Sequence, residues 1–114
     1  LGGLSVLSRL RELRTDVDVL YLGDRAWAPY GDRSFDDVRR RTHAIADAVI
    51  GLGATVVVVA CNTASAAALG SLRLLHPEIP FVGMEPAVKP AVDASRSGII
   101  GVLATRTTFQ GELF

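Results

Sequence analysis

The chain has 114 residues, enough for one domain with a hydrophobic core, and hydrophobic residues make up 49% of it, which excludes a disordered chain. Lysines and arginines number 12 and so do aspartates and glutamates, so no net charge draws the protein to nucleic acid or to an anionic membrane. No apolar run reaches the roughly 20 residues that span a bilayer, and a single cysteine is typical of a reducing compartment, so we expect a cytoplasmic protein.

The first half of the sequence predicts two helices and a strand. Leucines at 4, 7, 10 and 13 recur at helical spacing and predict an amphipathic helix. Residues 17–22 then predict a strand, followed by a loop over 24–33 that is rich in turn residues. Ser34, with Asp37 three residues on, is typical of a helix N-cap, and the helix that follows should end at Gly51 and Gly53.

The second half alternates strands and helices. Residues 55–60 are apolar and β-branched, which predicts a central strand of a parallel sheet. The other expected elements are a helix over about 64–75 that His76-Pro77 stops, a strand over 79–83, a helix opened by Glu85-Pro86, a strand over 98–103, and a helix opened by residues 105–108 that continues to Phe114. This alternation predicts an α/β fold with an open parallel sheet and helices on both faces. Because the chain starts without methionine and stops inside a predicted helix, we expect one domain over residues 1–114, truncated at both ends.

Several known motifs can be excluded. The glycines at 51 and 53 precede a strand, whereas a dinucleotide-binding fingerprint follows one. Ala64 and Ala67 stand where a thioredoxin-type pair would need a second cysteine and a cysteine phosphatase its arginine. Two histidines and one cysteine without clustered acids are too few ligands for zinc, so we expect no metal site.

Cys61 has the most informative position in the sequence. It follows the 55–60 strand, and ligands of open parallel sheets bind outside the carboxyl ends of the strands. The helix behind it presents unpaired N–H groups and a partial positive charge, which favour a thiolate. Asn62, Thr63 and Ser65 are polar and suit an anion-binding crevice, although one of them would suffice to cap the helix. A lone cysteine is more often a packing residue, and that alternative stays open.

Two other carboxyl ends should meet the same edge of the sheet. Tyr30 and Gly31 lie in the loop after the 17–22 strand, and Thr105 and Thr108 follow the last strand. No histidine accompanies the thiol, which weakens a hydrolase interpretation. A thiolate without a histidine favours proton abstraction from carbon, in which the thiolate itself is the base.

Four segments together resemble bacterial glutamate racemases, of the cofactor-independent aspartate/glutamate racemase superfamily: GGLSVL at 2–7, YLGDRAWAPYG at 21–31, VVACNTASAAAL at 58–69 and GVLATRTT at 101–108. The resemblance implies one half of a two-domain racemase fold. It also implies a two-base mechanism, in which one cysteine thiolate removes the α-proton of glutamate and a second cysteine thiol protonates the opposite face. No cofactor and no metal take part, and the product, D-glutamate, supplies peptidoglycan synthesis.

The resemblance also assigns roles to residues of this chain. Cys61 corresponds to the first of the two catalytic cysteines. The residues that it implies as substrate contacts are Tyr30, Gly31, Asn62, Thr63, Thr105 and Thr108. For Thr105 and Thr108, capping of the last helix is an equally good alternative role.

The sequence departs from the family pattern in several places. The family's D-S-G segment would lie just before Leu1, and its second cysteine, in a G-C-T-H segment, lies in the other half of the family's proteins. Arg25 and Trp27 replace a threonine and an arginine in the loop that borders the site, where they could equally form a rim or an oligomer contact, and a homodimer stays open. We therefore expect a missing C-terminal domain as the partner of this chain, and no racemase activity of the chain alone.

Two alternatives for the function remain. The substrate could be aspartate or another amino acid, because a difference of one methylene gives little discrimination in a pocket. The alternative from another class is a non-catalytic domain that binds a small molecule with the same fold.

Overall fold

The computed structural model describes residues 2–111. In this range the elements are α1 (Gly2–Leu13), α2 (Phe35–Gly51), β1 (Val57–Val59), α3 (Asn62–Leu75), β2 (Phe81–Gly83), α4 (Val88–Ala94) and α5 (Arg106–Gln110). None of the helices found there combines the length and the apolar composition needed to cross a membrane. The predicted continuation of the last helix to Phe114 lies outside the described residues.

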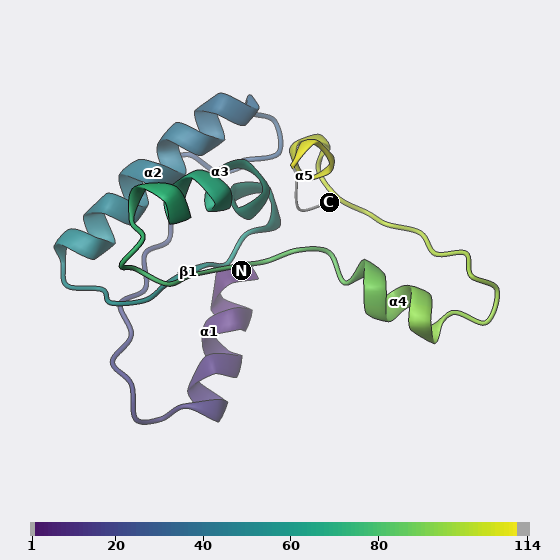
Figure 1. The fold of residues 1–114 in the computed structure, drawn as a ribbon, viewed down its shortest axis with the longest axis horizontal. Coiled ribbons are helices and arrows are strands. Elements are labelled where there is room, and N and C mark those ends of the chain that lie inside the picture. Colours follow the sequence, from purple (N-terminus) through teal and green to yellow (C-terminus); the bar gives the residue numbers. More distant parts are fainter. Residues whose placement is uncertain (1, 112–114) are drawn as a thin grey trace.

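The body of the molecule is a small parallel sheet covered by two helices. β1 and β2 pair in parallel, with Val57 opposite Phe81. α3 connects the two strands and packs against both, and α2 packs against α3 and β1 (Figure 1). The core between them consists of Ala46, Val57, Ala68, Leu69, Leu72 and Phe81. Since parallel strands need a crossover connection, this arrangement confirms the predicted α/β class.

Alternate residues of β1 point to opposite faces of the sheet. Val57 is buried in the core beneath α2 and α3, whereas Val58 is 40% exposed and borders a cavity. Val6, Leu7 and Leu10 of α1 line the other side of that cavity. Helices therefore lie on both faces of the sheet, as the alternation of elements predicts.

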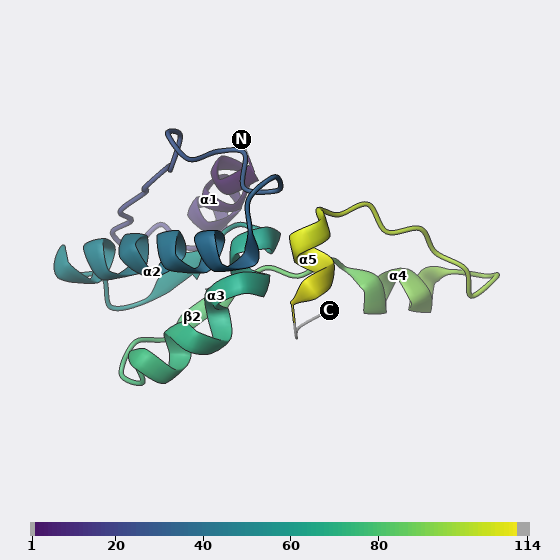
Figure 2. The ribbon, with the colours of Figure 1, turned by 90° about the horizontal axis from the view of Figure 1, so that it is seen from above.

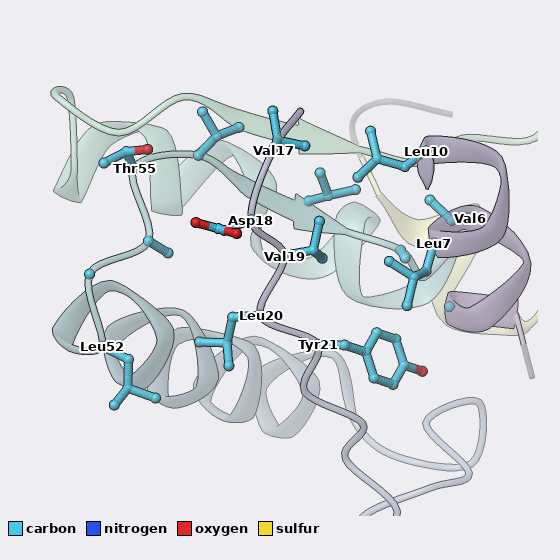
Figure 3. Close-up of a pocket in the computed structure, with 16 residues that line it drawn as sticks. Val6, Leu7, Leu10, Val17, Asp18, Val19, Leu20, Tyr21, Leu52 and Thr55 are labelled. Atoms are coloured by element: carbon cyan, nitrogen blue, oxygen red, sulfur yellow. The ribbon is translucent and has the colours of Figure 1, made fainter. Parts of the chain in front are cut away.

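Two predicted strands are wrong. Residues 17–22 form no strand, because a strand needs a hydrogen-bonded neighbour and a cavity of ≈ 630 Å³ lies between this segment and β1 (Figure 3). Residues 98–103 form none either, and Ile99 in this segment is 81% exposed. In both segments the apolar pattern indicates a preference for extended backbone. That preference alone does not provide a neighbouring strand for hydrogen bonding.

The region that includes α4 extends away from the body. Figures 1 and 2 both show α4 carried on long connections at one side of the molecule, and α4 has no buried residue. α5 returns to pack against α3, where a Cβ on Gly111 would lie 2.5 Å from the Cβ of Ala66. The organisation of residues 1–114 as one domain stays a prediction.

The predicted helix ends of the body are confirmed. The Ser34 side chain caps α2 by accepting a hydrogen bond from the Asp37 N–H at 3.1 Å. At the other end, Gly53 has φ +95°, a left-handed conformation that glycine adopts at little cost, directly after the cap residue Leu52. His76 ends α3, as expected of a residue before proline.

Candidate active site

Cys61 lies between the end of β1 and the start of α3. It is the N-cap residue of this 14-residue helix, with extended backbone at φ −147° and ψ 123°, and its side chain makes no capping hydrogen bond. The thiol is free and partly exposed. It is therefore available at the helix end that carries partial positive charge.

Three threonine hydroxyls meet beside the start of α3. The Thr63 Oγ1 lies 2.9 Å from the Thr105 Oγ1 and 3.4 Å from the Thr108 Oγ1, and the last two lie 2.9 Å apart. Thr63 and Thr108 are buried. The Thr105 side chain also accepts a hydrogen bond from the Thr108 N–H and caps α5, so the capping role is confirmed for Thr105, and the contact of these threonines with a substrate stays a prediction. The cluster joins the N-terminus of α3 to that of α5.

The Tyr30-Gly31 turn closes against the same cluster. A Cβ on Gly31 would lie 2.8 Å from the Thr105 Cγ2, so only glycine lets the turn approach this closely. The Tyr30 ring packs in an apolar cluster with Val38 and Cys61. The turn therefore approaches Thr105, the cap of α5, through its backbone, and Tyr30 packs against the same apolar cluster as Cys61.

Asp24 holds the hydroxyl of Tyr30. Its carboxylate accepts a hydrogen bond from the Tyr30 hydroxyl at 2.6 Å and two from the Arg41 guanidinium at 2.8 Å each. Mainly because of the hydrogen bonds from Arg41, the pKa of Asp24 is lowered to about 2. Burial, and then the hydrogen bond to Asp24, raise the pKa of Tyr30. The Tyr30 hydroxyl is thus protonated at neutral pH and does not act as a base.

Two arginines of the same chain lie over the Trp27 ring. The Cζ of Arg33 lies 4.3 Å and that of Arg41 5.5 Å from the centre of the indole ring. The Arg33 Nε also donates a hydrogen bond to the Trp27 carbonyl at 2.8 Å. This residue, at which the loop departs from the family pattern, therefore stacks within the chain.

Two cavities border this region. One of ≈ 470 Å³ is lined by Asp24, Tyr30, Cys61 and Ala64, among others, and reaches the thiol. The larger one, which Figure 3 shows, lies between α1, residues 17–21 and β1. Its lining includes Ala60, the residue before Cys61, but not Cys61 itself. Only the smaller cavity has Cys61, Tyr30 and Asp24 in its lining, so it is the better candidate for the active site.

The structure brings most of the predicted site residues together. Cys61 and Tyr30 pack against one apolar cluster and line one cavity, and Gly31 and Thr63 both contact Thr105. Asn62 is exposed at the first position of α3, directly after the thiol. No group of three or more histidine, cysteine or acidic side chains within residues 2–111 could hold a metal ion.

Sequence reasoning missed Arg41 and gave Ser65 only a general role. Arg39 and Arg40 each pair with an aspartate three residues earlier, whereas Val38 occupies that position for Arg41. An arginine that has no acidic residue three positions before it, and that lies on the apolar side of a helix, indicates a partner from a distant part of the chain. The Ser65 hydroxyl bonds to the backbone of Val59 in β1 and of Met84 directly after β2, which no local pattern indicates.

The comparisons with known proteins agree with this geometry. The family model of Asp/Glu/Hydantoin racemases matches residues 4–114. The chain belongs to this family. The predicted resemblance to glutamate racemases is confirmed by curated relatives. The glutamate racemase of Roseiflexus sp. (strain RS-1) is 54% identical over 99% of this chain and 42% of its own length, and that of Ectopseudomonas mendocina (strain ymp) is 48% identical over 99% and 43%.

A solved structure is similar as well. Glutamate racemase of Escherichia coli, in complex with L-glutamate and the activator UDP-MurNAc-ala, is 41% identical and superimposes with a TM-score of 0.87. The match covers 98% of this chain and 42% of that protein. The chain therefore spans less than half the length of the relatives that it matches.

Proposed function

We propose that this chain is the part of a glutamate racemase that carries one of its two catalytic cysteines. The observation that carries the proposal is the placement of Cys61 at the carboxyl end of β1 and the N-terminus of α3, with Tyr30 lining the same cavity and the threonine cluster beside the start of α3. Membership of the racemase family and the glutamate racemase relatives support the same activity.

The chemistry follows from the position of the thiol. The Cys61 thiolate takes the α-proton of bound glutamate, and the electron pair left on the α-carbon forms a carbanion. A second thiol, outside this chain, gives a proton to the opposite face, and the product is the other enantiomer. Each turnover thus moves one proton onto Cys61 and one off its partner, and no oxidant or reductant is needed.

The hydroxyls and backbone groups around the thiol would hold the substrate. Thr63, Thr105, Thr108 and the exposed Asn62 lie at the N-termini of α3 and α5, where unpaired N–H groups attract a carboxylate. The Tyr30-Gly31 turn borders the same space and is held by Asp24. A substrate carboxylate there would place the α-carbon towards Cys61.

Exchange of the α-proton tests the role of Cys61. In deuterated water, the whole protein with Cys61→Ser should lose exchange at the α-carbon of one glutamate enantiomer far more than of the other. The reason is that only one face of the α-carbon meets Cys61. NMR of the α-proton signal of each enantiomer measures this. Unchanged exchange for both enantiomers would remove Cys61 from the mechanism.

Activity should require more than the 114 residues. One face of the substrate has neither an acid nor a base when Cys61 is the only thiol, so we expect no conversion of L- to D-glutamate by this chain alone. Polarimetry of the isolated chain checks this, and measurable conversion would contradict it. We expect the remaining length of the relatives to supply the second thiol.

Aspartate is the second candidate substrate, since the family model covers racemases of both amino acids. The rate of α-proton exchange with glutamate against aspartate decides between them. A binding domain without catalysis would show saturable binding of either amino acid and no exchange. A cytoplasmic location is a further proposal, supported by the single cysteine.

A further inference from the structure

Ser65 is a buried polar residue whose hydroxyl leaves its own helix. The side chain sits in the first turn of α3 and is 1% exposed. A serine inside a helix usually bonds to a carbonyl three or four residues earlier. The Ser65 hydroxyl instead donates to the Val59 carbonyl in β1 at 3.0 Å and accepts from the Met84 N–H after β2 at 2.9 Å.

These two backbone groups are the ones that the sheet register would join next. Val57 pairs with Phe81 and its N–H bonds to the Pro80 carbonyl at 3.0 Å. In a parallel ladder this pattern continues with the Met84 N–H directed at the Val59 carbonyl. Ser65 therefore places its hydroxyl between the two strands at the last rung, at the edge where they end.

The same residue holds the backbone on both sides of Cys61. The Ser65 N–H bonds to the Cys61 carbonyl at 2.9 Å, and its hydroxyl bonds to the carbonyl of Val59, two residues before the thiol. A Cβ on Gly83 would lie 3.2 Å from the Ser65 Oγ, which shows how closely β2 approaches this point. One side chain thus ties the strand before the thiol, the helix after it and the neighbouring strand together.

We propose that Ser65 is a positioning residue for Cys61, which fixes the place from which the thiol meets the α-carbon. This inference rests on the proposed racemase function. Ser65 touches neither substrate nor proton. Its effect is geometric, and a small displacement of a reacting group is costly in a reaction that needs near-contact distances.

The primary deuterium isotope effect on kcat/KM tests this inference in the whole protein, measured separately with α-deuterated L- and D-glutamate. With Ser65→Ala, transfer to or from Cys61 becomes the slower of the two proton transfers. The isotope effect should then rise for the enantiomer whose deuteron Cys61 takes and fall for the other, while kcat/KM drops by about tenfold or more. Cys61→Ser identifies which enantiomer this is.

Ser71 offers a matched control on the same helix. Its hydroxyl bonds locally to the Ala68 carbonyl at 3.0 Å and to His43, nearly three helical turns away from the thiol. Ser71→Ala should leave both isotope effects and kcat/KM at the wild-type values. A change as large as that of Ser65→Ala would overturn the inference.

The outcomes separate this inference from the proposed function. Absence of racemisation by the wild-type whole protein would refute the function itself. A folded Ser65→Ala enzyme with lower kcat/KM but unchanged isotope effects would refute positioning, because general loss of structure slows both transfers alike. If circular dichroism shows that Ser65→Ala is unfolded, the same measurement on Ser65→Cys decides, since a thiol of similar size makes only weak hydrogen bonds.

Discussion

The two faces of β1 differ although all three residues of the strand are valines. Val57 faces α2 and α3 and is 9% exposed, whereas Val58 faces the cavity beside α1 and is 40% exposed. The first face is a packed core, and the second borders a cavity of ≈ 630 Å³. The thiol that follows this strand belongs to the packed side, where Cys61 lies against the buried cluster of Val38, Ala64 and Ala67.

The packed face should lose most when it is truncated. Leu72 is fully buried in the core of α3, β1 and β2, and Leu72→Ala should lower the free energy of unfolding by about 2–5 kcal/mol, as cavity-forming changes do. Urea denaturation followed by circular dichroism measures this. Leu74→Ala, at a position of the same helix that is 83% exposed, is the control and should change stability by less than about 0.5 kcal/mol. Equal losses would remove the contrast between packed and open surfaces.

The ion pair of Asp24 with Arg41 should stabilise the fold less than the buried core does. Its pKa is lowered to about 2, mainly by Arg41, so its contribution is complete above the usual carboxyl range near pH 4 and is lost as the pH falls through 2. Asp24→Asn should cost about 1 kcal/mol at pH 7, a value that allows for solvent around the partly exposed Arg41.

Urea midpoints at pH 7, 5 and 2.5 check this prediction. The difference between wild type and Asp24→Asn should shrink towards the lowest pH. Asp36→Asn removes an exposed ion pair with Arg39 on α2, the helix that carries Arg41, and serves as the control. A difference for Asp24→Asn that stays constant with pH would show that the carboxylate charge does not contribute.

A smaller effect is expected where α2 meets α3. The His43 Nε2 lies 2.7 Å from the Ser71 Oγ, and burial lowers the pKa of His43, with Asp47 opposing and His76 and Arg39 adding to the shift. A lowered pKa means that stability is complete above the usual histidine value near 6.5 and declines as the pH falls below it. Between pH 7.5 and 5.5, wild type should lose more stability than His43→Gln, measured by thermal unfolding. Parallel losses would assign the pH dependence to another group.

Much of the body could be predicted because its signals are local. Ser34 and the glycines at 51 and 53 mark the ends of α2 by their own backbone chemistry, and the valine run marks β1. The segments 17–22 and 98–103 were predicted wrongly because pairing depends on residues far away in the chain. Periodicity cannot report whether such a neighbour is present.

The candidate site shows the same division. The position of Cys61 at a strand end and helix start is local, and the motif resemblance located its threonine and tyrosine neighbours. The contacts of Asp24 with Arg41 and of Ser65 with Met84 join residues 17 and 19 positions apart, and they depend on how helices and strands pack. The predicted roles of the site residues in substrate binding stay predictions that the exchange experiments test.

The smallest expected effect tests the comparison of the two faces directly. Val58→Ala removes side-chain volume beside a cavity that already exists, so little packing is lost, and the free energy of unfolding of the 114-residue chain should change by less than about 0.5–1 kcal/mol. Val57→Ala, the same substitution one residue earlier, opens a cavity in the core and should cost about 2 kcal/mol. Urea denaturation of both variants gives the ratio. A loss for Val58→Ala as large as for Val57→Ala would mean that the face beside α1 is as closely packed as the face beneath α3.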